Sequence, residues 1–365
     1  MLLPSRPFPA DSGARLRNAG LLALLAEEHM VDTLIPEAVE RSTARRVADL
    51  LRSDAPDMAQ RLWSASFADR VRRQLQQRAY DAVQAEGIEM ARYLDCAPSV
   101  SWVYDAHNAE FLLQRRLAQS GPALGRLYSR IQWRRLERFE GQVVARSRMT
   151  LAVSEHDANQ LIALGGPPAT VRVVPNAIDV ATYPFRLPAD NDATNLLFVG
   201  KLDFRPNATG LAWFLQTVLV HFSDLRVFAV GAAPPPWLVR AVQHDDRIAV
   251  TGYVADERPY FARSAALILP VQTGGGSRLK ALVAMASGVP IVSTRLGMEG
   301  LEAEPGTHYL QADSADEWVG ALRRLVHDAS LRQHLACRAR TLVEERYTWS
   351  ALRDRVRSAY AWLNP

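Results

Sequence analysis

A series of short apolar runs limits the folds that are open to this chain. The runs are bounded by turn or helix-capping residues, and helical patterns follow most of them; they comprise residues 101–104, 150–153, 171–174, 195–199, 225–230, 248–250, 266–269 and 291–293. They are apolar throughout and do not alternate, which is typical of parallel strands that helices cover on both faces. The sequence therefore predicts the α/β class.

The chain has 365 residues, which is enough for two domains. Residues 181–192 contain two prolines and few apolar side chains in their second half, so we expect the domain boundary there. One sheet domain is expected over residues 1–180 and a second over residues 193–347. The amphipathic pattern within residues 348–365 predicts a helix that docks on one of them.

Several function classes are excluded by missing patterns. No run reaches the eighteen or so apolar residues of a membrane span, and residues 1–6 lack the apolar stretch of a signal peptide, so we expect a cytoplasmic protein. Cys96 and Cys337 lie far apart without metal-ligand spacing, which predicts neither disulfides nor a zinc site. The chain has no GxGxxG after a strand, no GxxxxGK[ST] and no GxSxG, so dinucleotide dehydrogenases, P-loop enzymes and α/β-hydrolases are not expected.

Neither a nucleic-acid partner nor a DxD metal site is expected. The formal net charge of +4 is too diffuse to indicate a nucleic-acid partner. Residues 190–192 read Asp-Asn-Asp and imitate a metal-binding DxD motif, but they precede their strand, so no metal site is expected.

Only two lysines stand among the 43 basic residues, and both flank glycine-rich turns. Lys280 ends the segment Thr-Gly-Gly-Gly-Ser-Arg-Leu-Lys (273–280), which follows the strand at 266–269 and opens a helix. Glycines let a backbone approach a ligand closely, and the amides and dipole of a helix start favour an anion. With Arg278 and Lys280 beside it, this turn predicts a phosphate or diphosphate site. The alternative is a flexible glycine turn that binds nothing.

The second lysine, Lys201, follows Gly200 directly after the strand at 195–199. Pro206 suits the first turn of the next helix, and Lys201 and Arg205 lie on the connection that leads to it. Ligands of open α/β sheets bind outside the carboxyl ends of strands, so the two lysine-bearing loops are expected to converge on one diphosphate. Chance placement of the two lysines is the alternative.

A polar segment, residues 104–110, follows the strand that ends near Val103. His107 lies there among Asp105, Asn108 and Glu110, and a histidine at such a strand end can transfer a proton or donate a hydrogen bond to a sugar hydroxyl. We interpret it as a site residue; a structural histidine is the alternative. Near the N-terminus, Gly13 belongs to another glycine loop ahead of an apolar helix.

Two arginine-rich helical stretches lie in the first domain, at about 44–78 and 111–146. Arginines on such a helix can extend toward lipid phosphates while its apolar residues face the membrane. A solvated helix face in a lysine-poor protein is the alternative. Contact with an anionic membrane surface is therefore one of two interpretations.

Together these segments resemble retaining glycosyltransferases of family 4, also called glycosyl transferases group 1. The resemblance covers nearly the whole chain and includes the N-terminal glycine loop, residues 105–110, the Pro-Asn-Ala-Ile-Asp segment at 175–179, the Gly200 loop, residues 252–253 and residues 274–290. It implies the GT-B fold, which has two Rossmann-like domains with parallel sheets facing across a cleft. The helix within 348–365 would then cross back to the first domain.

The resemblance also implies roles for individual residues. The donor diphosphate would face a set consisting of Gly13, Lys201, Arg205, Gly275, Gly276, Ser277, Arg278, Leu279 and Lys280. His107 would face the sugar or the acceptor as the catalytic residue, and residues 251–254 would lie near the base. Charge on the departing nucleoside diphosphate would be neutralised by helix starts and cations, so the chemistry would need no metal or other cofactor.

Position 283 departs from the family pattern. Relatives commonly carry two glutamates eight positions apart in the donor loop, and Gly275 and Val283 occupy those positions here. The second glutamate normally accepts hydrogen bonds from the donor ribose, and losing such a bond weakens binding about ten- to hundredfold.

The implied function is transfer of a sugar from a nucleoside diphosphate sugar to a hydroxyl acceptor, with retention, in cell-surface, exopolysaccharide or glycolipid synthesis. The acceptor would be lipid-linked, with the protein peripheral on the inner membrane. Two alternatives stay open: a non-catalytic GT-B partner subunit, which Val283 motivates, and a nucleotide-sugar epimerase of the same architecture. The chain begins almost inside the first glycine loop, as a misassigned start codon would produce.

Overall fold

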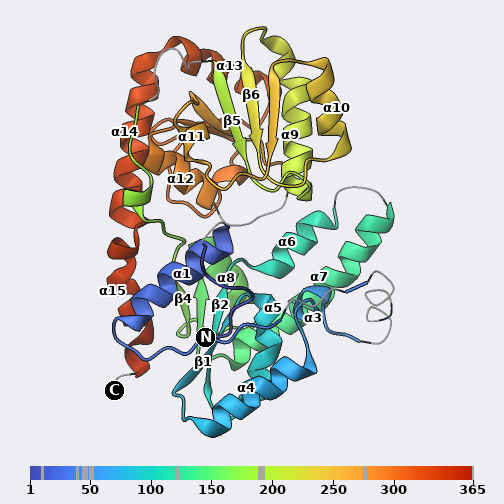
Figure 1. Cartoon of the computed structure of the whole chain (residues 1–365), viewed down its shortest axis with the longest axis vertical. Coiled ribbons are helices and arrows are strands. Elements are labelled where there is room, and N and C mark those ends of the chain that lie inside the picture. Colours follow the sequence, from blue (N-terminus) through green and yellow to red (C-terminus); the bar gives the residue numbers. More distant parts are fainter. Residues whose placement is uncertain are drawn as a thin grey trace. The chain divides into compact units, whose positions relative to one another are not determined.

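The computed structural model describes residues 1–9, 12–37, 41–42, 48, 53–119, 123–187, 194–273 and 278–363. It divides into two compact units, Met1–Asn176 with Leu352–Pro365 and Ala177–Ala351. Each unit holds a parallel sheet with helices packed on it, which confirms the predicted α/β class (Figure 1). Within the described ranges, no helix combines the length and the apolar character that crossing a membrane requires.

The first unit contains a four-stranded sheet in the order β1-β2-β3-β4. Its strands pair in parallel and are β1 (Ala82–Glu86), β2 (Ser101–Ala106), β3 (Met149–Ala152) and β4 (Val171–Val173). Leu2 forms a parallel bridge with Ala85 and so extends the sheet beyond β1. Alternate side chains of β2, Trp102 and Tyr104 among them, are buried in the hydrophobic core of this unit.

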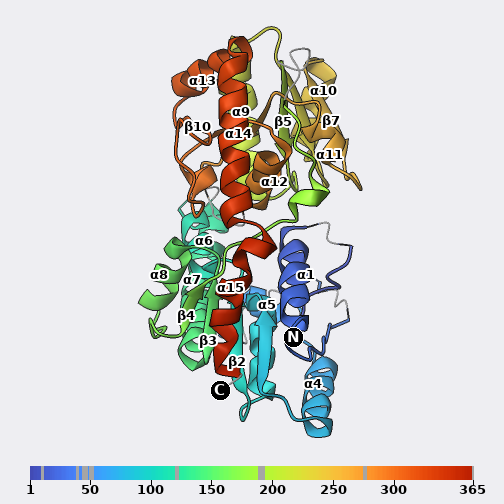
Figure 2. The ribbon, with the colours of Figure 1, turned by 90° about the vertical axis from the view of Figure 1, so that its left-hand side faces the viewer.

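Helices connect and cover these strands. They are α1 (Gly13–Ala26), α3 (Asp57–Gln60), α4 (Ala65–Gln77), α5 (Ile88–Ala91), η1 (Arg92–Cys96), α6 (Glu110–Leu117), α7 (Ala123–Arg146) and α8 (Glu155–Ala163). The last helix, α15 (Trp349–Tyr360), is followed by η6 (Ala361–Leu363), and the part from Leu352 onward belongs to the first unit. Figure 2 shows this part of α15 beside the sheet, where the Tyr360 hydroxyl donates a hydrogen bond to Gln84 of β1.

The second unit contains a six-stranded parallel sheet in the order β10-β9-β8-β5-β6-β7. The strands are β5 (Asn195–Val199), β6 (Arg226–Val230), β7 (Ile248–Gly252), β8 (Ala266–Leu269), β9 (Ile291–Ser293) and β10 (Leu310–Gln311). From the β5–β8 pair the chain proceeds outward in both directions, which is the doubly wound arrangement.

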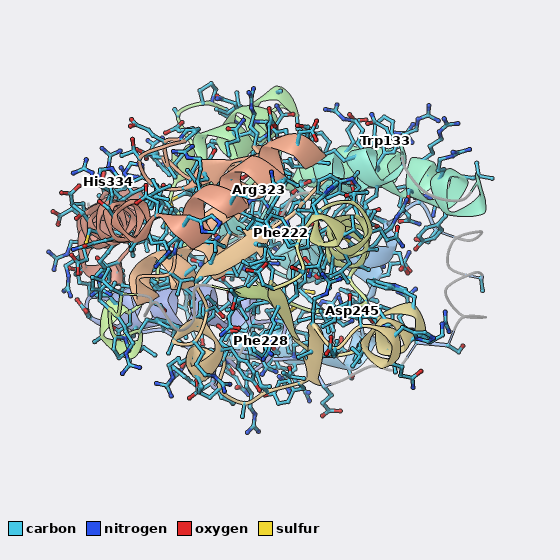
Figure 3. The ribbon with its side chains drawn as sticks, turned by 90° about the horizontal axis from the view of Figure 1, so that it is seen from above. Trp133, Phe222, Phe228, Asp245, Arg323 and His334 are labelled. Carbon is cyan, nitrogen blue, oxygen red and sulfur yellow. The ribbon has the colours of Figure 1, made fainter. Side chains whose placement is uncertain are left out.

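Helices of this unit are η2 (Val180–Thr182), α9 (Arg205–Thr217), η4 (Leu219–His221), α10 (Pro236–His244), α11 (Arg258–Phe261), α12 (Leu279–Ser287), η5 (Leu296–Met298), α13 (Ala315–His327) and α14 (Ala329–Arg346). Phe214 of α9 and Trp318 of α13 meet edge to face in the core at a centroid distance of 5.4 Å. At the surface of α13, the Arg323 guanidinium lies 5.9 Å from the ring centroid of Phe222; Figure 3 labels both residues.

All the predicted strands are present, and the helix ends follow ordinary capping chemistry. Ser154 caps α8 by accepting a hydrogen bond from the Asp157 amide at 3.0 Å. Gly288 ends α12 with φ of 81°, in the left-handed region that favours glycine. The sequence pattern missed β1 and β10: β1 carries the buried polar residues Gln84 and Glu86, which interrupt an apolar run, and β10 has only two residues.

Candidate functional site

The loops after β5 and β8 meet at the point where the doubly wound sheet changes direction. β5 leads to α9 and β8 leads to α12, while the two strands pair directly through Leu196 and Leu197. Connections that leave adjacent strands in opposite directions open a crevice at the carboxyl edge of the sheet. The fold thus places both lysine-bearing loops at the edge where open α/β sheets bind ligands.

Lys280, on the first turn of α12, reaches across to the Gly200 loop. Its Nζ donates to Asn207 Oδ1 at 3.1 Å and lies 5.3 Å from the ring centroid of Phe198. A Cβ at residue 200 would lie 3.0 Å from Lys280 Nζ and 2.9 Å from Asn207 Nδ2, and φ there is +144°. Gly200 is therefore required for the close approach of the two loops.

Asn207 joins these loops through both ends of its amide. Its Nδ2 donates to the Lys201 carbonyl at 2.8 Å while its Oδ1 accepts from Lys280. The Lys201 ammonium lies 3.3 Å from Asp203 Oδ1, and its side chain is 65% exposed. Asn207 thus links the backbone of Lys201 to the side chain of Lys280.

The surroundings of Lys280 make its ammonium group a poorly neutralised cation. Burial and the nearby Arg278 lower the pKa of Lys280 to about 8, against the opposing effect of Glu257. An anionic ligand beside the ammonium group would favour its charged form. This edge of the sheet is therefore suited to a phosphate group.

The other donor-loop residues have different surroundings. Arg278 donates to the carbonyls of Leu296 at 2.5 Å and Glu299 at 3.2 Å, so its guanidinium also anchors η5. Leu279 begins α12 and is buried, and Val283 is only 2% exposed within the same helix.

The structure does not test the roles of the remaining residues predicted to bind the donor. Gly275, Gly276 and Ser277 lie outside the described residues, as does the Asp-Asn-Asp segment at 190–192. Arg205 is the half-buried first residue of α9. Gly13 begins α1 in the other unit, after Ser12. The roles assigned to these residues stay predictions.

In the first unit, His107 lies at the carboxyl edge of the sheet beside two buried carboxylates. Its Nε2 is 3.5 Å from Glu86 Oε2 and 3.5 Å from Asp105 Oδ2, and its side chain is 16% exposed. Glu86 and Asp105 are fully buried. Gly87 follows β1 with φ of +79°, and a Cβ there would lie 3.5 Å from His107 Nδ1.

Arg17 of α1 compensates Asp105. Its Nε donates to Asp105 Oδ2 at 2.8 Å, its second guanidinium nitrogen donates to Oδ1 at 2.6 Å, and its remaining nitrogen donates to the Val174 carbonyl at 2.9 Å. Burial opposes ionisation of Asp105, but Arg17 and His107 hold its pKa well below the usual range. Asp105 is therefore a carboxylate at neutral pH.

The same two carboxylates keep His107 protonated. Burial acts to lower the pKa of His107, but hydrogen bonds and charges from Asp105 and Glu86 outweigh it and raise the pKa to about 10. Burial and the charge of Asp105 raise the pKa of Glu86 to about 7. An imidazolium at this edge donates hydrogen bonds from both ring nitrogens.

Glu86, Asp105 and His107 are also the group of described residues with the spacing to hold a metal ion. The Arg17 guanidinium already neutralises Asp105 through three hydrogen bonds, and His107 in its protonated form has no lone pair to offer a cation. The cluster therefore fits proton sharing better than metal binding.

Two further carboxyls lie near this edge. Glu110, which begins α6, accepts from Asn108 Nδ2 at 3.0 Å, and burial together with Glu89 raises its pKa to about 7. Glu140 of α7 accepts from the Phe111 amide at 3.0 Å and from the Tyr104 hydroxyl at 2.9 Å. The start of α6 is thus held by a buried carboxyl group.

Sequence patterns missed Arg17, Glu86 and Asn207 as members of these clusters. Arg17 stands among the apolar residues of α1, and Glu86 ends the strand that the apolar pattern did not reveal. A buried charge in an apolar element is a sign of a partner elsewhere in the fold. That partner, Asp105 for Arg17, is 88 residues away in sequence.

Comparison with known proteins matches both halves of the chain. Residues 19–182 match the family model for Glycosyltransferase Family 4, and residues 193–328 match that for Glycosyl transferases group 1. The chain is 29% identical over 257 residues to a D-inositol 3-phosphate glycosyltransferase of Kineococcus radiotolerans. That match covers 60% of this chain and 58% of the relative.

Solved structures share the fold at low sequence identity. Sucrose-phosphate synthase from Thermosynechococcus elongatus has a TM-score of 0.76 at 16% identity, over 99% of this chain and 98% of that one. HepE from Anabaena, solved with UDP-glucose, has a TM-score of 0.67 at 13% identity, over 99% of both chains. WaaG, a glycosyltransferase involved in lipopolysaccharide biosynthesis, has a TM-score of 0.66 at 16% identity, over 100% of this chain and 99% of that one.

The two family matches cover successive parts of the chain that contain its two parallel sheets, and the fold is that of the GT-B proteins above. The chain therefore belongs to the glycosyltransferases of family 4, the glycosyl transferases group 1.

Proposed function

We propose that the protein transfers a sugar from a nucleoside diphosphate sugar to a hydroxyl acceptor, with retention of configuration and without a metal. The carrying observation is the approach of Lys280 to the Gly200 loop at the carboxyl edge of the second sheet. A half-buried ammonium group at this edge, with helix starts on both sides, matches the charge of a diphosphate. HepE, which shares the fold, has been solved with UDP-glucose, which supports a nucleotide-sugar donor.

Neutralising the leaving group is the chemical task that these residues would perform. Negative charge grows on the diphosphate as the glycosidic bond breaks, and preorganised cations and amides stabilise that charge without reorganising. Lys280 would supply the cation. His107, as an imidazolium, would donate a hydrogen bond to a hydroxyl of the sugar or of the acceptor.

A nucleotide panel tests this function. We expect UDP, GDP, ADP or TDP to raise the melting temperature of the full chain, and the matching nucleotide sugar to be consumed when an acceptor is present. Val283→Glu restores the carboxylate that relatives direct to the donor ribose, so it should tighten binding of that nucleotide about tenfold or more. Val283→Leu is the matched control, because it keeps the site apolar.

The alternatives give different results in the same assays. A partner subunit without catalysis predicts that no nucleotide raises the melting temperature and that Val283→Glu restores no binding. An epimerase predicts product in the absence of any acceptor. Either result would replace the transferase proposal.

We also propose that the protein works in cell-surface polysaccharide or glycolipid synthesis, from the cytoplasm, with α7 lying on an anionic membrane. Arg126, Arg130, Arg134 and Arg138 follow one another at four-residue spacing on α7, and all four are exposed. Such spacing places them along one face of the helix. Leu127, which is 56% exposed beside them, adds an apolar side chain that can enter the lipid interface.

Vesicle sedimentation measures this association. Changing these four arginines to glutamine should weaken binding to vesicles rich in phosphatidylglycerol by about two to three orders of magnitude, since each arginine contributes about 1 kcal/mol at an anionic surface. The control changes four exposed arginines elsewhere, Arg72, Arg73, Arg323 and Arg324. Equal losses in both variants, or equal binding to neutral phosphatidylcholine vesicles, would contradict a specific α7 surface.

A further inference from the structure

A buried polar chain runs through the first unit from the C-terminal helix to the edge of the sheet. The Tyr360 hydroxyl donates to Gln84 Oε1 at 2.5 Å, and Gln84 Nε2 donates to Glu86 Oε1 at 2.5 Å. Tyr360, Gln84 and Glu86 are 4%, 5% and 0% exposed. Gln84 and Glu86 are two residues apart on β1, so their side chains lie on the same face of the sheet.

The second oxygen of Glu86 faces His107. Glu86 Oε2 lies 3.5 Å from His107 Nε2. The Asn18 amide lies against the same pair: with its nitrogen turned inward, that nitrogen is 3.0 Å from Glu86 Oε2, 3.1 Å from the Ala14 carbonyl oxygen and 3.1 Å from His107 Nε2. Nε2 of His107 therefore lies among the Asn18 amide and the carboxylates of Glu86 and Asp105.

Glu86 differs from Asp105 in how its charge is balanced. Asp105 has the Arg17 guanidinium on both of its oxygens. The partners of Glu86 are two neutral amide groups and His107. No arginine or lysine among the described residues donates a hydrogen bond to Glu86, so its charge is balanced chiefly by His107, with weaker contributions from Arg17 and the Met1 ammonium. A buried carboxylate that depends on one imidazolium points to a role toward that group.

We propose that Glu86 is a positioning residue for His107, and that Gln84 and Tyr360 hold its carboxylate in place. This inference rests on the proposed function, in which His107 donates a hydrogen bond to substrate. Glu86 and Asp105 accept from Nε2, which directs the other nitrogen, Nδ1, to the side of Gly87. Gly87 has no side chain to cover Nδ1, and the Glu89 carboxylate lies on the same side, with Oε2 3.0 Å from the position that a Cβ of residue 87 would take.

The charge of Glu86 then decides what Nδ1 does. With both carboxylates present, the imidazole keeps both protons at neutral pH and Nδ1 donates. Without Glu86, the remaining acceptor is Asp105, which Arg17 already neutralises, so the ring would lose a proton more easily and Nδ1 would become an acceptor. The other titratable groups around this cluster are the Met1 ammonium and Arg17, which both interact with the charge of Glu86, together with Glu110 of α6, Glu89 of α5 and Tyr360 of α15.

Imidazole titration by NMR in the full chain, labelled with ¹⁵N-histidine, tests the proposal directly. His107→Gln assigns the His107 signals by their loss. We expect Glu86→Gln to lower the pKa of His107 by more than one unit and Tyr360→Phe to lower it by a smaller amount. In transfer assays at saturating donor, the rate of Glu86→Gln should fall at a lower pH than the rate of the native protein.

Matched controls separate positioning from simple damage to the core. Tyr93→Phe removes another buried hydroxyl of the first unit, one that bonds to the Leu62 carbonyl. Glu140→Gln alters another buried carboxyl, whose hydrogen bonds go to Tyr104 and the start of α6. Neither should shift the titration of His107. Tyr360→Phe keeps the ring in the core, so it serves if Glu86→Gln fails to fold.

An unchanged pKa of His107 in folded Glu86→Gln, or in Tyr360→Phe where Glu86→Gln does not fold, would overturn the proposal. This outcome is distinct from failure of the proposed function. The titration needs no nucleotide or acceptor, so it stands even if no sugar is transferred. Conversely, sugar transfer with an unshifted His107 would refute the positioning role alone.

Discussion

Changing Lys280 to methionine is expected to weaken binding of a nucleoside diphosphate about ten- to hundredfold, which corresponds to losing one charge-assisted hydrogen bond of about 1.5–3 kcal/mol. Methionine is similar in length and fills the space beside Phe198 without the charge. Isothermal titration calorimetry with the nucleotide found in the panel measures the effect. The melting temperature should not fall, because the charged form of Lys280 opposes folding in its half-buried position.

The pH dependence of binding provides an independent signature of Lys280. The pKa of Lys280 in the free protein is lowered to about 8, so the ammonium form is present below that pH and is lost above it. The affinity of the native protein should therefore fall as pH rises through about 8, until the pKa in the complex is reached. Lys280→Met should show no such fall in that range.

Lys201→Met is the matched control. Lys201 is the other lysine of the chain, but its side chain is 65% exposed and lies beside Asp203, so water and that carboxylate already screen its charge. Its removal should cost less than that of Lys280. If Lys280→Met binds nucleotide as the native protein does, the proposed donor site is wrong.

Changing His107 to alanine is expected to lower the rate of sugar transfer by about 10²- to 10⁴-fold, the usual contribution of a positioned proton donor. The nucleotide affinity should stay within about twofold, because the cations proposed to bind the diphosphate belong to the second unit. Single-turnover rates with the donor in excess, together with calorimetry, separate these two quantities.

His327→Ala is the control, since His327 is exposed at the end of α13. A loss of rate below about threefold in His107→Ala would show that His107 takes no part in the reaction. A parallel loss of nucleotide affinity would instead indicate that the first unit contributes to donor binding.

Much of this architecture follows from local patterns. Continuous apolar runs predicted the strands from β2 to β9, because a strand buried on both faces has no polar side. The helix start at Pro206 was predicted as well, since proline suits the first helical turn whatever its tertiary partners are. The order of residues along the chain also sufficed to place both lysines at strand-to-helix turns.

The burial and the partners of each charged side chain could not be predicted from local sequence patterns. Lys201 and Lys280 looked alike in sequence, yet one is exposed beside Asp203 and the other lies half-buried against Asn207 and Phe198. Arg278 was predicted beside the diphosphate, and the structure shows in addition that it donates to the backbone carbonyls of Leu296 and Glu299, which no local pattern indicated.

The buried cluster around His107 shows the same division. The sequence alone predicted that His107 follows a strand and has polar neighbours. Its charge depends on Glu86, Asp105 and Arg17, which come from separate elements, and on Tyr360, 276 residues beyond Gln84. Secondary structure is governed by contacts over a few residues, whereas a pKa depends on burial and on charges that only the folded chain brings within a few ångströms.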